Sequence, residues 1–157
     1  MNLVRLLPAA ALLLVGCLPN DTTDVTIPDP IALEQQTWGA TLNISLASFT
    51  KLPSGVYMQD TQVGTGNTLS GLQTVRVYYT GYLANGTRFD GNVGAASPAV
   101  FPLANLIQGW QVGMQGMKVG GRRRLLIPSS LGYGSAGVGP IPPNANLVFD
   151  IELNGIA

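Results

Sequence analysis

The stretch VYYTGYLANGTRFDG, residues 77–91, contains a run of alternating residues, an Asn-Gly pair and a short return segment around Phe89-Asp90. Asn85-Gly86 favours the tight turn of a β-hairpin, because both residues tolerate a positive φ. In the longer run TVRVYYTGYL, residues 74–83, alternate side chains fall on one face of an extended chain, namely Val75, Val77 and Tyr79. The stretch therefore predicts two antiparallel strands joined by a hairpin.

Three further segments have strand character, at residues 54–64, 122–128 and 145–153. Between the strands lies LIQGWQVGMQGM, residues 106–117, in which apolar residues recur at three- and four-residue spacing. This spacing fits one or two helical turns, although glycines interrupt it. The pattern predicts a small antiparallel α+β domain with one short helix on the apolar face of the sheet.

The composition excludes several classes of chemistry. The chain of 157 residues has no histidine and one cysteine, so a histidine-based triad, an imidazole base, a usual zinc site and an internal disulfide are not expected. Its formal net charge is zero, which gives no sign of a nucleic-acid partner. The 20 glycines and 11 prolines indicate many turns, and the 46% hydrophobic content is sufficient for a core.

The amino end, MNLVRLLPAAALLLVGC, has the pattern of a signal peptide over residues 1–16. Its apolar run, residues 6–15, is too short to span a bilayer as a helix. The run ends in LVGC, which resembles the bacterial lipobox, and this resemblance implies cleavage before Cys17 and lipidation of its thiol and new amine. Leu18 follows the cysteine; in Gram-negative lipoproteins an aspartate there favours inner-membrane retention, so the resemblance implies the outer membrane or its periplasmic face if the source is Gram-negative. An ordinary secretory signal with a chance cysteine is the alternative.

A change in composition divides the rest of the chain near residue 50. Residues 18–50 carry four acidic residues and no lysine or arginine, whereas residues 51–157 carry seven basic and four acidic residues. Residues 17–50 are therefore interpreted as a lipidated cysteine and an acidic tether, and residues 51–157 as the folded domain. Residues 37–51 are ambiguous, because their apolar side chains fit either an extra strand or a segment lying on the domain.

Colinear motifs in residues 51–157 resemble the FKBP-type peptidyl-prolyl cis/trans isomerase domain. They are Tyr79-Thr80-Gly81, then Gly86, Phe89 and Asp90, then Ile107-Gln108-Gly109-Trp110, Met117 and Gly120, then Leu131-Gly132-Tyr133-Gly134, and finally residues 141–153. Each motif alone is weak, but their shared order and spacing make the resemblance specific. It implies a bent antiparallel β-sheet wrapped around one short α-helix, with a substrate pocket between the two.

The resemblance also implies a role for individual residues. The catalytic set would be Asp90, Tyr79, Phe89 and Tyr133, with Asp90 beside the twisting amide and Tyr133 donating from the rim. The substrate-binding set would be Trp110 as the floor, Phe149 as a wall beside Tyr79 and Phe89, Leu106 and Ile107 at the side, and Ile141 in the flap loop. The backbone N–H of Ile107 would donate to a substrate carbonyl.

One position departs from the family pattern. Ala99 stands where the family often has a second aromatic wall, and the nearest aromatic residue, Phe101, is expected to point into the core. The loop SAGVGPIPP, residues 135–143, contains no long insertion, which argues against an extra chaperone domain there. The run Arg122-Arg123-Arg124 is interpreted as a solvated strand start.

The expected function is cofactor-free rotation of X–Pro bonds in exported proteins, which would assist their folding. The barrier to this rotation is amide resonance of about 18–20 kcal/mol, so no nucleophile is obligatory. The expected partners are proline-containing polypeptides and, through Cys17, a membrane of the cell envelope; a monomer is expected. The alternative is a proline-binding or chaperone module of low activity, and a purely structural lipoprotein is the third possibility.

Overall fold

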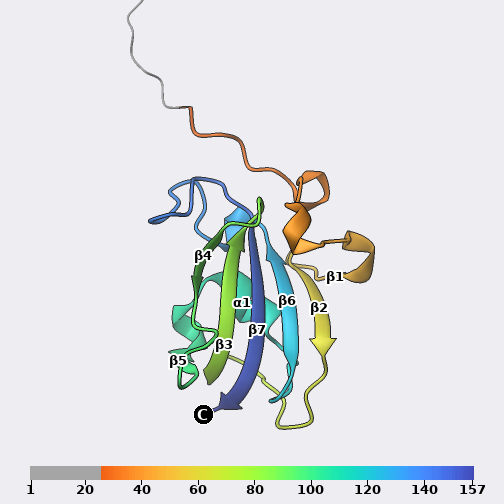
Figure 1. Cartoon of the computed structure of the whole chain (residues 1–157), viewed down its shortest axis with the longest axis vertical. Coiled ribbons are helices and arrows are strands. Elements are labelled where there is room, and N and C mark those ends of the chain that lie inside the picture. Colours follow the sequence, from red (N-terminus) through yellow and green to blue (C-terminus); the bar gives the residue numbers. More distant parts are fainter. Residues whose placement is uncertain (1–25) are drawn as a thin grey trace, which may run out of the picture.

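The computed structural model describes residues 26–157, so the predicted signal peptide and Cys17 lie outside the described residues. Within this part of the chain, one sheet has the strand order β1-β2-β6-β7-β3-β4, and β5 pairs with β3 (Figure 1). Every pairing is antiparallel. The strands are β1 (Thr50–Lys51), β2 (Tyr57–Gln62), β3 (Thr74–Leu83), β4 (Arg88–Gly91), β5 (Ala99–Pro102), β6 (Arg122–Ile127) and β7 (Leu147–Ile156).

The predicted hairpin is confirmed, because β3 covers the alternating run and β4 contains Phe89-Asp90. The turn is closed by hydrogen bonds from the Leu83 N–H to the Thr87 carbonyl and from the Gly86 N–H to the Leu83 carbonyl, both 2.9 Å. Only Gly86 of the Asn-Gly pair has a positive φ, of 92°. The glycine alone therefore supplies the left-handed backbone that reverses the chain.

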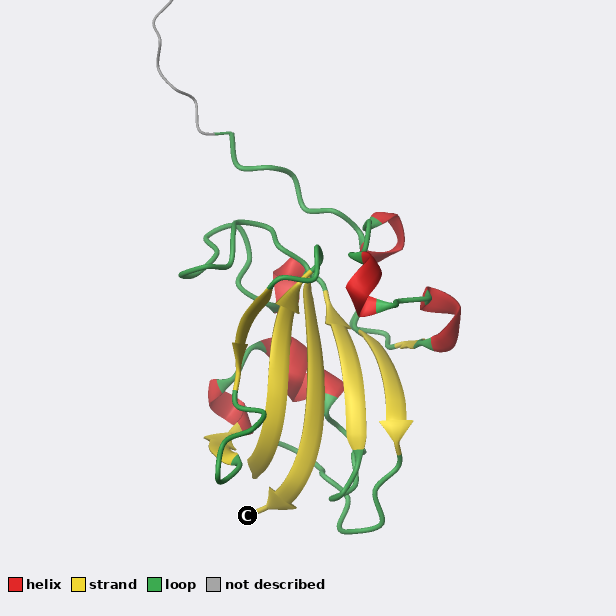
Figure 2. Cartoon of the chain, viewed as in Figure 1, coloured by secondary structure: helices red, strands yellow, loops and turns green. Residues whose placement is uncertain are grey.

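The helix α1 (Gln108–Gly113) lies across one face of the sheet, and the other helices are single 3₁₀ turns (Figure 2). These turns are η1 (Leu33–Gln35), η2 (Ala40–Leu42), η3 (Leu46–Ser48), η4 (Leu103–Asn105) and η5 (Ser129–Leu131). Two glycines of α1 face β6. A Cβ on Gly109 would lie 2.3 Å from Ile127 Cγ2, and one on Gly113 would lie 2.7 Å from Leu125 Cδ1. These glycines allow the helix to approach the sheet closely, and they do not interrupt the helix.

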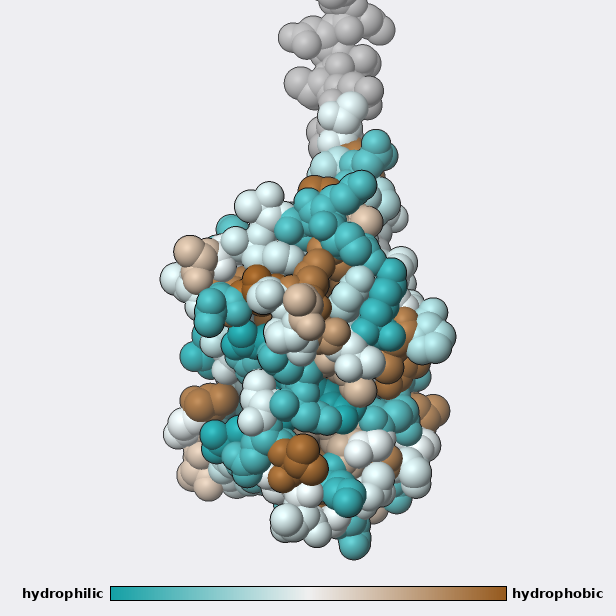
Figure 3. Space-filling view, turned by 90° about the vertical axis from the view of Figure 1, so that its right-hand side faces the viewer, coloured by the Kyte–Doolittle hydropathy of each residue, from teal (hydrophilic) through white to brown (hydrophobic). Residues whose placement is uncertain are grey.

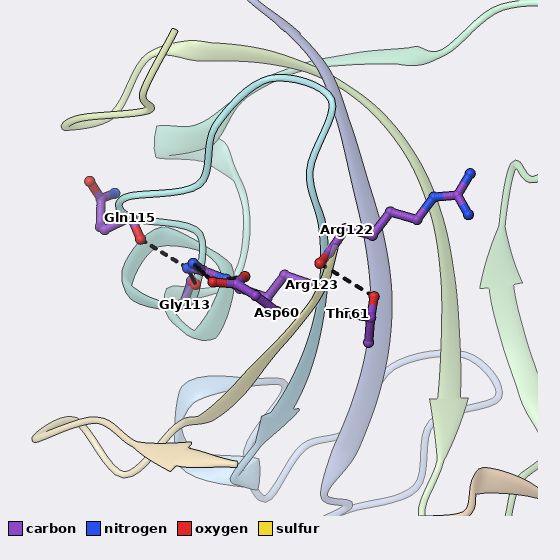
Figure 4. Close-up of polar contacts among 6 residues, drawn as sticks. All are labelled: Asp60, Thr61, Gly113, Gln115, Arg122 and Arg123. Carbon is purple, nitrogen blue, oxygen red and sulfur yellow. Dashed lines mark hydrogen bonds and ion pairs between the residues drawn. The ribbon is translucent and has the colours of Figure 1, made fainter. Parts of the chain in front are cut away.

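A buried arginine of β6 connects the end of α1 to the sheet by hydrogen bonds (Figure 4). The Arg123 guanidinium binds both carboxylate oxygens of Asp60, at 2.6 and 3.0 Å, and donates to the carbonyls of Gly113 and Gln115 at 2.8 and 2.9 Å. The side chain of Arg122, the residue before Arg123 on β6, points in the opposite direction (Figure 4). The interpretation of the three arginines as solvated is therefore wrong for Arg123, because strand alternation turns its side chain toward the helix.

The main core lies between α1 and the sheet. It contains Val75 and Val77 of β3, Leu125 and Ile127 of β6, and alternate residues of β7, together with Trp110 and Met114. Each strand thus buries the apolar set that its alternation predicts.

The second half of the predicted tether packs on the outer face of the sheet, which is the face away from α1. Leu33 and Leu42 are buried there against Tyr57, Leu126 and Val148. Partly buried apolar residues complete the cluster: Trp38, Ile44, Leu46, Phe49 and Tyr82. Residues 26–49 are called the N-terminal segment below. Seen from the edge of the sheet that carries β2 and the N-terminal segment, hydrophobic residues reach the surface in patches between hydrophilic ones (Figure 3).

For residues 37–49 this packing is one of the two alternatives that the sequence left open, but the prediction of a tether did not anticipate the burial of Leu33. Hydrogen bonds support the apolar contacts. The Gly39 N–H donates to the Ala84 carbonyl at 2.7 Å, and Arg124 Nη1 donates to the Leu42 carbonyl at 2.7 Å. Residues 37–49 therefore lie on the domain rather than forming an extra strand, and only Thr50–Lys51 pair, with β2. Within residues 26–157, no helix has the length and apolar character needed to cross a membrane.

Candidate functional site

A pocket of about 170 Å³ opens between α1 and the sheet, on the face that carries the main core. Its volume is below the range of sites for drug-sized ligands and suits a single side chain. The lining residues come from β3, β4, β5, β7, α1 and the loops beside them: Tyr79, Asp90, Phe101, Leu106, Ile107, Trp110, Tyr133 and Phe149. Seven predicted site residues therefore meet in one cavity, although they are separated along the chain.

Aromatic rings packed edge to face build the floor and walls. The Trp110 ring, which is 4% exposed, stands 5.4 Å from the Tyr79 ring and 5.3 Å from the Phe149 ring, at angles of 84° and 86°. The geometry matches the preferred arrangement of aromatic quadrupoles and holds the three rings rigidly. Trp110 is in the middle of this group. The position of α1, which Arg123 and the two glycines determine, therefore also determines the shape of the pocket.

Asp90 lies at the pocket mouth with both carboxylate oxygens engaged. The Tyr79 hydroxyl donates to Asp90 Oδ2 at 2.8 Å, and the Gly91 N–H donates to Asp90 Oδ1 at 2.7 Å. The carboxylate therefore orients Tyr79 and is itself fixed by its own backbone. Burial, and then the hydrogen bond to Asp90, raise the pKa of Tyr79 to about 12. Tyr79 thus stays protonated and remains a hydrogen-bond donor at neutral pH.

Two further donors face the pocket. Burial, followed by the Asp90 charge, raises the pKa of the Tyr133 hydroxyl, so Tyr133 also stays protonated at neutral pH. Within residues 26–157, neither this hydroxyl nor the Ile107 N–H donates a hydrogen bond to another protein group. Both are therefore available to an acceptor such as a peptide carbonyl.

Two predicted site residues do not line the pocket. The half-buried Phe89 lies behind the wall, with its ring 5.6 Å from the Phe149 ring at an angle of 88°. Ile141 is 5% exposed and belongs to the main core, where its backbone pairs with Val138. Phe89 supports a wall and Ile141 anchors the loop, so neither forms the cavity surface.

Sequence reasoning missed two contributors. Phe101 was expected to point into the core; it packs there in part, but it also lines the pocket, with its ring 6.0 Å from the Tyr79 ring. Gly81 leaves room for the wall, because a Cβ there would lie 2.7 Å from Phe89 and 2.8 Å from Phe149. The period of two in β5 puts Ala99 and Phe101 on one face, and this signal could have identified Phe101.

A larger groove of about 550 Å³ lies on the outer face of the sheet and contains none of the predicted site residues. Its acidic side chains already pair with arginines, Asp150 with Arg124 at 2.6 Å and Glu152 with Arg122 at 2.9 Å. Within the described residues there is also no group of three or more side chains suited to hold a metal ion. The aromatic pocket is therefore the candidate site.

Comparison with known proteins identifies relatives of this domain. The family model described as FKBP-type peptidyl-prolyl cis-trans isomerase matches residues 66–154. The chain is 47% identical over 103 residues to the FKBP-type peptidyl-prolyl cis-trans isomerase FkpA of Aeromonas hydrophila, covering 66% of this chain. It is 43% identical over 102 residues to an FK506-binding protein of Neisseria meningitidis serogroup B, covering 63% of this chain.

The solved structure of FkpA from Escherichia coli has a similar fold, with a TM-score of 0.66 and 38% sequence identity over 69% of this chain. The match covers 51% of that structure. The match with the Aeromonas relative covers 38% of that protein, whereas the match with the Neisseria relative covers 94% of that protein. The shared part is therefore one domain, which forms nearly all of some relatives and less than half of others.

Proposed function

The chain belongs to the family of FKBP-type peptidyl-prolyl cis-trans isomerases, and on this basis we propose that it catalyses rotation about X–Pro bonds in the aromatic pocket. The observation that carries the proposal is the convergence of Tyr79, Trp110 and Phe149 around a cavity with Asp90 at its mouth. The substrates are proline-containing segments of polypeptides, with the prolyl ring on Trp110.

Rotation requires the amide to lose its resonance, whose barrier is about 18–20 kcal/mol. The twisted amide has a less polar carbonyl than the planar amide, and water therefore solvates the planar amide better. An apolar pocket favours the twisted amide over the planar one. Such differential binding accelerates the reaction without a covalent step. An acceleration of about a thousandfold needs only roughly 4 kcal/mol.

Asp90 acts in this mechanism by its charge and by positioning. Its two oxygens already accept hydrogen bonds from Tyr79 and from the Gly91 N–H, so it is held in place and not placed to remove a proton. The free Ile107 N–H and Tyr133 hydroxyl bind substrate carbonyls on either side of the twisting bond. Catalysis therefore rests on a fixed arrangement of donors, one charge and three rings.

Replacing Asp90 by alanine is expected to lower kcat/KM about tenfold, because a charge-assisted hydrogen bond and the orientation of Tyr79 are both lost. Phe89→Ala is expected to lower it to a similar extent, because the Phe149 wall loses its support. The measurement is cis/trans exchange of a short X–Pro peptide followed by NMR.

Two controls make this measurement specific. Asp90→Asn keeps an acceptor for Tyr79 but removes the charge, so it separates positioning from electrostatics. Asp150→Ala removes a carboxylate from the outer face and is expected to leave the rate unchanged. If the unmodified chain binds peptide saturably without accelerating exchange, and Phe89→Ala abolishes the binding, the domain is a proline-binding module and not an isomerase.

We further propose that the protein is exported and anchored in the cell envelope through lipid on Cys17, where it assists the folding of exported chains. The support is the sequence pattern of residues 1–17 and the position of the only cysteine at the end of LVGC. X–Pro isomerisation is slow enough to limit folding, so an isomerase is useful where chains arrive unfolded.

Cys17→Ser is expected to abolish incorporation of labelled fatty acid and, because processing requires the cysteine, to leave residues 1–16 attached. Isomerase activity should stay unchanged, because Cys17 lies far along the chain from the pocket residues. Labelling that persists in Cys17→Ser, or absence of labelling in the unmodified chain, would reject the lipid anchor.

A further inference from the structure

The chain between β6 and β7, residues 128–146, is a loop that carries Tyr133 into the pocket, and we call it the flap loop. Its two ends are buried and joined by one hydrogen bond, from the Ser129 N–H to Asn146 Oδ1 at 3.1 Å. Its tip is exposed, with Val138 51% accessible, and three of its glycines have a positive φ: Gly134, Gly137 and Gly139. Backbone hydrogen bonds within the loop and the buried Ile141 hold part of it, but each glycine leaves the backbone a wide choice of conformations.

The N-terminal segment adds hydrogen bonds to the loop from outside it. Asn146 Nδ2 donates to the Ile31 carbonyl at 2.7 Å and to Gln36 Oε1 at 2.9 Å. Asn144 Nδ2 donates to the Pro28 carbonyl at 2.6 Å. These bonds join residues 110 to 116 positions apart in sequence. The segment and the flap loop lie at the same end of the sheet (Figure 1).

Both asparagines connect directly to the part of the loop that faces the pocket. Asn146 is 2% exposed and holds the N-terminal segment with its amide nitrogen while its amide oxygen closes the loop at Ser129. The Asn144 N–H donates to the Gly134 carbonyl at 2.8 Å, and Gly134 is the neighbour of Tyr133. A displacement at Pro28 would therefore be transmitted to the neighbour of Tyr133 through two hydrogen bonds, and a displacement at Ile31 or Gln36 through three.

We propose that residues 28–36 brace the flap loop and thereby set the position of Tyr133 for substrate binding, with Asn144 and Asn146 as positioning residues. The inference rests on the proposed function, because it assigns Tyr133 to substrate. Without the brace, the loop around Tyr133 has more conformational freedom, and the part of this freedom that is lost when the peptide binds weakens binding. Loss of the brace should therefore raise KM more than it lowers kcat.

The test uses the full chain with Asn144→Gly combined with Gln36→Met. Asn144 has a φ of 56°, which glycine adopts freely, so the substitution removes the side-chain bond without straining the backbone. Methionine matches glutamine in length but accepts no hydrogen bond. KM is expected to rise about fivefold and kcat to change less than about twofold, since each lost hydrogen bond contributes modestly. Amide exchange at Gly134, Val138 and Asn144 should accelerate.

Ser48→Ala is the matched control. Ser48 lies in the N-terminal segment but outside residues 28–36, and its hydroxyl donates to the Ser45 carbonyl at 2.8 Å. Its loss also removes a side-chain hydrogen bond from the segment, but KM and exchange in the flap loop should stay unchanged. A double variant with wild-type KM and wild-type exchange in the loop would overturn the brace.

The two proposals fail in different ways. If the unmodified chain does not accelerate X–Pro exchange, the proposed function fails, but amide exchange in the two variants still decides whether the segment braces the loop. If the chain is active and the single variant Asn144→Gly shows neither a higher KM nor faster exchange at Gly134, Asn144 is not a positioning residue.

Discussion

Replacing Arg123 by methionine is expected to lower the free energy of unfolding by about 3 kcal/mol, the lower end of the cost of breaking a buried ion pair. The Arg123 side chain is 4% exposed. It forms an ion pair with Asp60 and donates hydrogen bonds to two carbonyls at the end of α1. Methionine fills similar space but leaves the carboxylate without its partner and both carbonyls unsatisfied. Asp60 is 36% exposed, so water compensates part of the loss. Urea unfolding followed by tryptophan fluorescence measures the change.

Arg122→Met is the control for this prediction. The Arg122 side chain is 59% exposed and pairs with Glu152 on the outer face, so its loss should cost no more than about 1 kcal/mol. Equal destabilisation by the two substitutions would show that Arg123 contributes no more than a surface ion pair. Because Arg123 also fixes the helix that carries Trp110, its loss should additionally reduce isomerase activity in the molecules that remain folded.

Trp110→Ala is expected to have the largest effect on activity, with kcat/KM about a hundredfold lower. The substitution removes the pocket floor and also the ring against which Tyr79 and Phe149 stand edge to face. Loss of a buried tryptophan should lower the free energy of unfolding by about 3–5 kcal/mol as well. Peptide exchange must therefore be measured at a temperature where the circular dichroism spectrum shows the variant to be folded.

The second tryptophan provides the matched control. Trp38 packs on the outer face in the N-terminal segment, and its Nε1 is buried with no hydrogen-bond partner in the described part of the chain. Trp38→Phe removes this unsatisfied donor and should leave both stability and activity close to wild type. If Trp38→Phe and Trp110→Ala lost activity equally, the pocket would not be the place where the reaction occurs.

The long elements of the fold could be predicted from sequence, because their signals are local. The alternation in β3 runs over ten residues and ends at a glycine turn, so β3 was found with both of its ends. By contrast, β1 and β5 have two and four residues, and only their neighbours in the sheet make them strands. The docking of residues 37–49 was one of two alternatives that their apolar side chains allowed, whereas the docking of Leu33 was missed because it is an isolated apolar residue.

The site was predictable to the extent that it repeats a family pattern. The resemblance indicated which residues meet, and seven of the predicted residues line the cavity. It put Ile141 in the flap loop, where Ile141 lies, but it did not anticipate the burial of this side chain or the contribution of Phe101. The role of Arg123 was also hidden, because it depends on where the last turn of α1 ends in space.

The last strand of the chain occupies a central place in the sheet, between β6 and β3. It pairs with β3 from Val75 to Leu83 and with β6 from Arg122 to Ile127. Among the described strands, the two halves of the sheet therefore do not pair with each other until residues 147–156 are inserted between them. A nascent chain of this topology cannot close the sheet before residues 147–156 have been made. The position of one strand thus delays folding of the domain until that strand is available.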